Sequence, residues 1–151
     1  MTTLADLTTL RVGGSIARLV PATSADSLVE AVRAADASGA PLLVVGGGSN
    51  LLASDEPFEG TVVDVQPFAE VASIIHEDSD GSAIVRAGAG TVWDEFVSWT
   101  LAQGLSGVEA LSGIPGTVGA SPVQNVGAYG HEVSETISSV EAYDRLTGDV
   151  V

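Results

Sequence analysis

A strand-length apolar segment that runs directly into three glycines constrains this chain more than any other feature. Pro41–Val45 reads PLLVV, and Gly46, Gly47 and Gly48 follow it. The continuous apolar run predicts a short strand, Leu42–Val45, buried on both faces. Glycine loses more backbone freedom on folding than any other residue, so three in a row are costly unless the chain needs positive φ or a close backbone approach. The pattern therefore predicts a strand that ends in a loop whose backbone another group contacts closely.

The first part of the chain, residues 1–66, is predicted to form one α+β lobe. A helix capped at residue 23 or 24 runs to Ala37, with apolar residues on one face and Gly39 past its end. The strand and glycine loop follow, and Thr61–Val65 predicts a further strand between Gly60 and a proline. The order is helix, strand, glycine loop, strand.

A break near Pro67 divides the chain into two lobes, and residues 67–151 are predicted to form the second, also α+β. The runs VASII and SAIVRAG, separated by HEDSDG, predict a hairpin. Thr91 opens a helix to Gln103, with Asp94 as its capping-box partner. SSVEAYDRLTGDVV predicts a second hairpin, whose return strand stops at Val151.

The charge balance excludes several classes of function. The 151 residues hold 20 acidic and 5 basic side chains, a formal net charge of −15, which repels nucleic-acid backbones and anionic membranes. All five cations are arginines, so Schiff-base chemistry and a Walker-type phosphate site are unavailable. The lack of cysteine excludes disulfides and thiolate metal sites, and the lack of a signal sequence and of a long apolar span predicts a soluble, cytoplasmic protein. We also expect a monomer without a metal site.

The first glycine loop predicts an anion site. A strand that ends in glycines leaves successive backbone N–H groups unpaired, and such concavities bind phosphate. Ser49 and Asn50 add neutral donors. In a chain this acidic, local amide dipoles are the available means of attracting a diphosphate. A plain tight turn stays open as the alternative, and the loop matches neither the Walker nor the dinucleotide-binding pattern.

A second candidate lies in the long irregular segment from Leu105 to Gly130. Loops of that length in compact domains are usually functional. Within it, Gly113, Gly116 and Gly119 recur every third residue and interleave with small apolar residues. A surface built of such small residues lets the backbone approach a flat ligand, while nearby amide side chains supply uncharged hydrogen bonds. A mere connector is the alternative.

Five stretches, in matching order and spacing, resemble the UDP-N-acetylenolpyruvoylglucosamine reductases, flavoenzymes of peptidoglycan precursor synthesis. They are RVGG, LLVVGGGSNLL, AGAGTVWDEFV, GLSGVEALSGIPGTVGASPVQNVGAYGHE and YDRLTG. The similarity spans essentially the whole chain, and IPGTVGASPVQNVGAYG is highly specific to the family.

The resemblance implies an α+β, two-lobed FAD-binding fold of the vanillyl-alcohol-oxidase type that holds FAD non-covalently between the lobes. In the family the first glycine loop holds the pyrophosphate, here Gly46, Gly47, Gly48, Ser49, Asn50 and Leu51. The second loop lies along the flavin, here Ile114, Pro115, Gly116, Gly119, Ala120, Ser121, Val123, Gly127 and Ala128. The substrate side matches Gln124, Asn125 and Tyr129.

The resemblance also implies a hydride relay from NADPH through the flavin to the enolpyruvyl double bond of a UDP-sugar, giving UDP-N-acetylmuramate. The family's catalytic serine, arginine and glutamate lie further along than Val151, and no Gly-Tyr-Arg occurs here; Arg145 belongs to the hairpin. We therefore expect an FAD-binding portion that lacks the substrate domain and does not turn over alone. Another non-covalent flavoprotein oxidase of this fold, or a catalytically silent FAD-binding fragment, are the alternatives.

Overall fold

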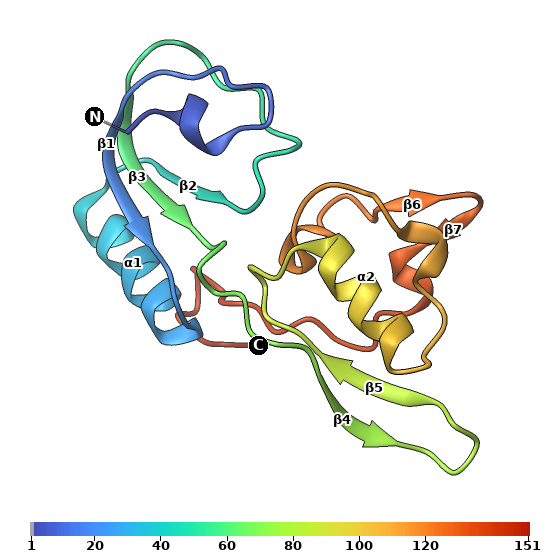
Figure 1. Cartoon of the computed structure of the whole chain (residues 1–151). Helices are drawn as coiled ribbons and strands as arrows, with labels where there is room; N and C mark the ends of the chain where they lie inside the picture. Colours follow the sequence, from blue (N-terminus) through green and yellow to red (C-terminus); the bar gives the residue numbers. More distant parts are fainter. Residues whose placement is uncertain (1) are drawn as a thin grey trace. The chain divides into compact units, whose positions relative to one another are not determined.

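The computed structural model describes residues 2–151, which form two compact units (Figure 1). Unit 1 contains the chain up to Phe68 together with Glu141–Val151, and unit 2 is Ala69–Val140. The division differs from the lobes predicted at 1–66 and 67–151, because the chain returns to unit 1 for its last eleven residues. Each unit has its own apolar core.

Unit 1 is built on a three-stranded parallel sheet. Its strands are β1 (Ile16–Pro21), β2 (Leu42–Val45) and β3 (Phe58–Asp64), in the order β1-β3-β2. The central strand β3 supplies the fully buried Val62 and Val63. The prediction that β2 is buried on both faces is wrong: β2 lies at the sheet edge, and the side chain of Val44 is 49% exposed.

The two faces of this sheet are covered by different segments. Val63 packs with Ala31 of helix α1 (Ala25–Ser38), whereas its neighbour Val62 packs with Leu4 at the start of the 3-10 turn η1 (Leu4–Leu7). This follows from strand geometry, since successive side chains point to opposite faces. The N-terminal segment is therefore an integral layer of unit 1.

Helix α1 has the ends that the sequence predicts. The Ser24 hydroxyl accepts a hydrogen bond from the Ser27 N–H at 3.2 Å, which caps the first turn. Gly39 follows the helix with φ of 67°, and its N–H bonds to the carbonyls of the last turn.

The returning segment Glu141–Val151 is tied to α1 by two arginines. The Arg33 guanidinium donates to the Gly148 carbonyl at 2.8 Å and to the Tyr143 hydroxyl at 3.0 Å. Arg145 forms a salt bridge with Asp36. Within the segment, Ala142 and Val151 exchange two backbone hydrogen bonds, so the predicted hairpin around residues 147–148 is confirmed.

Unit 2 combines a hairpin with one helix and a series of short turns. Strands β4 (Ser73–Glu77) and β5 (Ala83–Arg86) form the predicted antiparallel hairpin. Helix α2 is Trp93–Ala102, close to its predicted span. The remaining elements are η2 (Glu109–Leu111), η3 (Val118–Ala120), β6 (Gly127–Ala128), β7 (His131–Glu132) and η4 (Val133–Glu135).

The predicted capping box of α2 is wrong. The N-cap is Val92, whose side chain has no polar atom to bond the first turn, and the Thr91 hydroxyl donates to the Glu70 carbonyl at 2.9 Å. Asp94 turns to residues 112–113 rather than back to Thr91.

The long segment after α2 is folded onto the core of unit 2. Leu111 is fully buried and packs with Trp93, and the Trp93 indole N–H donates to the Leu111 carbonyl at 2.8 Å. Val126 and Val133 close the same cluster from the far end of the segment. The segment thus contains only short elements of secondary structure, but its contacts with the core hold it in a defined position. Within residues 2–151, no helix is both long and apolar enough to cross a bilayer.

Candidate cofactor-binding site

The glycine loop follows the edge strand β2 and lies at the surface of unit 1. Gly46, Gly47, Gly48 and Ser49 are each partly exposed. Within residues 2–151, the N–H groups of these four residues donate no hydrogen bond to another backbone or side-chain group. A buried loop with these groups already bonded would exclude an anion site, and the structure has neither feature.

The carbonyl groups of the same loop are engaged by the protein. The Gly46 carbonyl accepts from the Gln66 side-chain amide at 3.0 Å, and the Gly48 carbonyl accepts from the Thr9 N–H at 3.1 Å. Because a peptide N–H points away from the carbonyl of its own plane, fixing these carbonyls also fixes where the neighbouring N–H groups point. The loop therefore offers preorganised donors whose acceptor comes from elsewhere, as a diphosphate would supply.

The presence of glycine at positions 46, 47 and 48 does not have a single structural cause. Only Gly48 has positive φ, 61°; Gly46 and Gly47 do not, so the predicted need for positive φ applies to one of the three. A Cβ on Gly48 would lie 1.8 Å from the Leu7 carbonyl oxygen. Gly48 is thus required by the packing of the N-terminal segment over the loop, an intramolecular cause.

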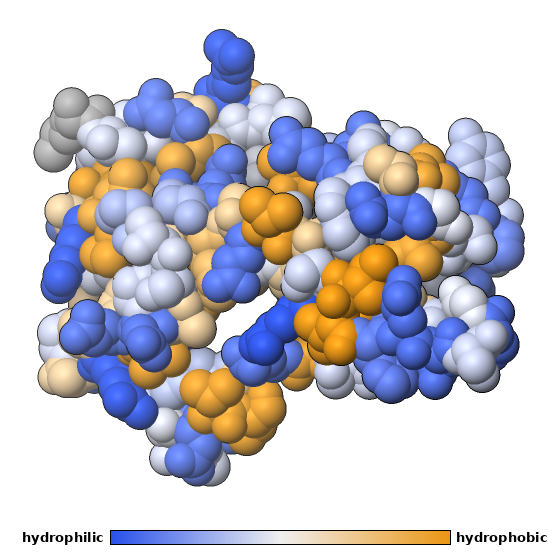
Figure 2. All heavy atoms as spheres, turned by 60° about the horizontal axis from the view of Figure 1, so that its bottom comes forward, coloured by the Kyte–Doolittle hydropathy of each residue, from blue (hydrophilic) through white to orange (hydrophobic). Residues whose placement is uncertain are grey.

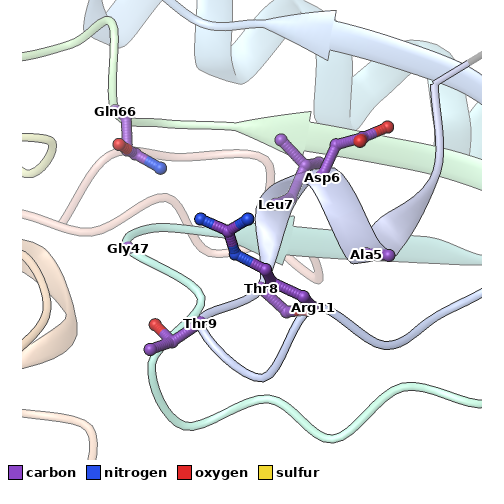
Figure 3. A pocket seen from close by; sticks show the side chains of 8 residues that line it. All are labelled: Ala5, Asp6, Leu7, Thr8, Thr9, Arg11, Gly47 and Gln66. Carbon is purple, nitrogen blue, oxygen red and sulfur yellow. The ribbon is translucent and has the colours of Figure 1, made fainter.

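An open pocket of about 590 Å³ lies beside the glycine loop (Figure 3). Every residue that lines it belongs to unit 1. They are Ala5, Asp6, Leu7, Thr8, Thr9, Arg11, Gly47 and Gln66. The pocket therefore joins the glycine loop to a segment, residues 5–11, that contains the RVGG arginine and that sequence reasoning does not assign to the site.

The predicted flavin-side residues lie in unit 2 and divide between core and surface. Ile114 and Ala128 are partly buried and pack against the core of unit 2. Ser121 is buried, and its hydroxyl donates to the Val118 carbonyl at 2.8 Å, so that hydroxyl is engaged within the protein. Apolar side chains also reach the surface (Figure 2); among the predicted site residues, Val123 is 86% exposed and Tyr129 is 91% exposed.

Two glycines of this segment permit close approach of the chain to itself. A Cβ on Gly119 would lie 2.6 Å from the Ala89 Cβ, and one on Gly127 would lie 2.9 Å from the His131 carbonyl oxygen. The Gly119 N–H also donates to the Ala89 carbonyl at 2.9 Å. The packing of unit 2 alone thus accounts for both of these glycines. Pro115, Gly116 and Ala120 are partly or largely exposed on the same segment.

The Asn125 amide forms a hydrogen bond through its nitrogen and another through its oxygen. Its NH₂ donates to the Glu132 carboxylate at 2.6 Å, and its oxygen accepts from the Ser134 N–H at 3.1 Å. These bonds brace the β6–β7 hairpin. The amide keeps one further N–H and one further acceptor position, so the predicted hydrogen bond to a substrate stays a prediction; neighbouring Gln124 is exposed.

Tyr129 stands at the tip of that hairpin. Tyr129 and Gly130 have φ of 54° and 83°, the pair of positive values typical of a type I′ turn. Positive φ is unusual for a bulky residue and is most often retained at functional positions. The turn projects an aromatic side chain into solvent, as the predicted substrate-side role requires.

The start of the segment is fixed by Asp94 on the first turn of α2. Its carboxylate accepts from the Gly113 N–H at 2.6 Å and from the Ser112 hydroxyl at 2.9 Å. These bonds, the Gly113 N–H foremost, hold the pKa of the Asp94 carboxyl below its usual value. An ionised carboxylate therefore anchors the chain where the glycine-rich stretch begins.

Residues 2–151 combine an α+β fold with a glycine loop whose N–H groups are uncommitted, and the comparisons identify the class of protein. The chain belongs to the family described as "FAD binding domain", whose model matches residues 16–151. Both the α+β FAD-binding fold and the resemblance to the reductases are confirmed.

The relatives carry one name. The chain is 52% identical over 143 residues to the UDP-N-acetylenolpyruvoylglucosamine reductase of Thermobifida fusca, covering 94% of this chain and 39% of that protein. It is 52% identical over 145 residues to the same reductase from Salinispora arenicola, again covering 39% of it. The crystal structure of the Thermus caldophilus reductase matches with a TM-score of 0.71 at 31% identity, covering 99% of this chain and 50% of that one. The chain thus spans about two fifths of the length of these curated relatives.

Proposed function

We propose that this chain holds FAD non-covalently as the cofactor-binding part of a reductase that converts UDP-N-acetylglucosamine enolpyruvate to UDP-N-acetylmuramate with NADPH. The observation that carries the proposal is the set of uncommitted N–H groups at Gly46–Ser49 in a chain of the FAD-binding family. The reductase names of the relatives support the substrate. Their uniform naming favours this function over that of a different flavoprotein oxidase.

The residues of this chain would bind and orient the cofactor. The loop from Gly46 to Leu51 donates its backbone N–H groups to the diphosphate, while the segment from Ile114 to Ala128 presents small and apolar groups to the flavin ring. Bound FAD supplies the hydride-transfer chemistry between NADPH and the enolpyruvyl double bond. Tyr129, exposed on its hairpin, would contact the substrate.

Flavin binding is the direct test. The purified chain, supplied with FAD, is expected to show a visible flavin spectrum and to change the fluorescence of added FAD on titration. Gly47→Val should weaken binding at least tenfold, because its branched side chain would project into the pocket beside the N–H donors. Ala37→Val, at an exposed position on α1, is the matched control and should bind as the wild type does. A colourless protein that leaves FAD fluorescence unchanged would contradict the proposal.

Formation of the product requires a test separate from the test of FAD binding. The resemblance to the reductases supports the expectation that these residues lack the proton donor, so the 151-residue chain with FAD, NADPH and enolpyruvyl substrate is expected to form no UDP-N-acetylmuramate. Steady product formation, followed by NADPH absorbance and by chromatography of the nucleotide sugar, would show that the chain carries its own proton donor. Cytoplasmic location and a monomeric state stay predictions.

A further inference from the structure

The five arginines of this acidic chain have different surroundings. Arg33 and Arg145 are engaged in holding the segment Glu141–Val151, and Arg86 also interacts within the protein. Within residues 2–151, the guanidinium groups of Arg11 and Arg18 have no hydrogen-bond or salt-bridge partner. Both are exposed, but only Arg11 lines the pocket beside the glycine loop.

The backbone holds Arg11 in place. Thr8 and Arg11 form a turn closed by the Arg11 N–H and the Thr8 carbonyl at 3.1 Å, and the buried Thr8 hydroxyl donates to the Val12 carbonyl at 3.0 Å. Arg11 has φ of 53°, in the left-handed region that L residues rarely adopt. Strained residues of this kind cluster at ligand-binding sites, and the turn fixes the direction in which the side chain leaves the backbone.

That direction is into the pocket. Figure 3 shows the guanidinium projecting from the segment 5–11 into the space that it lines together with Gly47 and Gln66. The same segment donates the Thr9 N–H to the Gly48 carbonyl at 3.1 Å, which ties the arginine turn to the glycine loop. The pocket volume of about 590 Å³ lies in the usual range for small-molecule sites.

The one carboxylate in the pocket is engaged elsewhere. Asp6 accepts from the Thr3 N–H at 2.8 Å and from the Thr3 hydroxyl at 2.9 Å. Figure 3 shows its carboxylate directed away from the Arg11 guanidinium. These two bonds hold the pKa of Asp6 below its usual value, so the carboxylate stays ionised and occupied by Thr3.

We propose that Arg11 is the cationic contact for the diphosphate of the bound dinucleotide, acting together with the N–H groups of the glycine loop. Guanidinium groups bind phosphate oxygens through two parallel hydrogen bonds, a geometry that an ammonium group lacks. Arg11 thereby supplies locally the positive charge that the chain lacks as a whole. This inference rests on the proposed function and adds to it the residue that selects for phosphate.

The test compares two exposed arginines. We expect Arg11→Gln to raise the Kd for FAD about tenfold or more, because a charge-assisted hydrogen bond contributes roughly 1.5–3 kcal/mol. Arg18→Gln, an equal loss of charge on β1, should leave the Kd within about twofold. Fluorescence titration with FAD gives the affinity, and competition with ADP reports the diphosphate and adenosine contacts without the flavin. Arg11→Lys should retain part of the affinity.

Riboflavin, which has no phosphate, separates a phosphate contact from a change in pocket shape. Its binding should be equal in the wild type and in Arg11→Gln. Equal FAD affinity in both proteins, or an equal loss for FAD and riboflavin, overturns the role of Arg11 while the proposed function stands. A wild-type chain that binds neither FAD nor ADP overturns both. Far-UV circular dichroism checks folding, and Arg11→Gly, which accommodates the positive φ, replaces Arg11→Gln if that variant unfolds.

Discussion

Among residues 2–151, three non-glycine residues hold positive φ, and all three lie at or beside the candidate site. They are Arg11, Asn125 and Tyr129, with φ of 53°, 49° and 54°. Arg11 and Tyr129 are exposed with their side chains in solvent, while Asn125 is braced by two hydrogen bonds. At this scale the chain accepts local backbone strain where a side chain has to be presented rather than packed.

A single added methyl group should separate the two reasons for glycine at position 48. Gly48→Ala combines positive φ with a Cβ 1.8 Å from the Leu7 carbonyl oxygen, whereas Gly39→Ala has φ of 67° and nothing within 4 Å. Both changes cost roughly 1 kcal/mol for the backbone conformation. Gly48→Ala should cost a further 1–3 kcal/mol or so, because the Leu7 segment must move.

Urea unfolding of unit 1, followed by far-UV circular dichroism, measures the difference in free energy of unfolding between these two variants. Equal losses would mean that the N-terminal segment is not packed over the loop.

Sequence reasoning at this scale identifies the glycine loop but not why each glycine is there. Three consecutive glycines after an apolar strand are a local signal. The contact between Gly48 and Leu7, and the place of Arg11 beside Gly47, depend on segments far apart in the sequence. Asn125 likewise makes contacts that its local sequence does not reveal, because its amide bonds to Glu132 and Ser134.

At the scale of elements, locally encoded features are predicted well. The cap at Ser24 and Gly39 beyond the end define α1, and turn-rich residues separate β4 from β5. Strand β1 is not predicted, because the sequence IARLVP shows no regular alternation of apolar and polar residues, and its pairing partner β3 lies far along the chain. The parallel sheet depends on such long-range pairing, which no local pattern reports.

The stabilisation that the Asp94 carboxylate gives by joining α2 to the glycine-rich segment should depend on pH. The pKa of Asp94 is lower in the folded protein than the ordinary value for an aspartate, chiefly because the Gly113 N–H bonds to its carboxylate. Its contribution to stability is therefore present above about pH 4 and is lost as the pH falls through the folded pKa. Asp94→Asn, which keeps an acceptor but no charge, should be less stable than the wild type at neutral pH.

The difference in the free energy of unfolding between wild type and Asp94→Asn should shrink as the pH is lowered from about 5 to about 3. Urea titrations followed by the fluorescence of Trp93 and Trp99 give this quantity for unit 2. If the difference in the free energy of unfolding between the two proteins stays constant with pH, the ionised carboxylate does not anchor residues 112–113.

At the scale of the whole molecule, the dominant property is the charge of −15. Like charges on a compact chain repel one another, and salt screens that repulsion over about 10 Å at 0.1 M. We expect Tm to rise by several degrees as sodium chloride is increased to about 0.5 M, with potassium chloride giving the same shift.

A fall in Tm would mean that exposed ion pairs, such as Arg145 with Asp36, outweigh the repulsion. Differential scanning calorimetry measures Tm at each salt concentration.

Unit 1 is discontinuous in sequence, since Ala69–Val140 intervenes between its two parts. During synthesis the ribosome must release all of unit 2 before Arg33 and Asp36 meet their partners in Glu141–Val151. Chain connectivity thus sets one step of folding: the three strands of unit 1 are all synthesised before unit 2, but α1 gains its contacts with Glu141–Val151 only after unit 2 has been made.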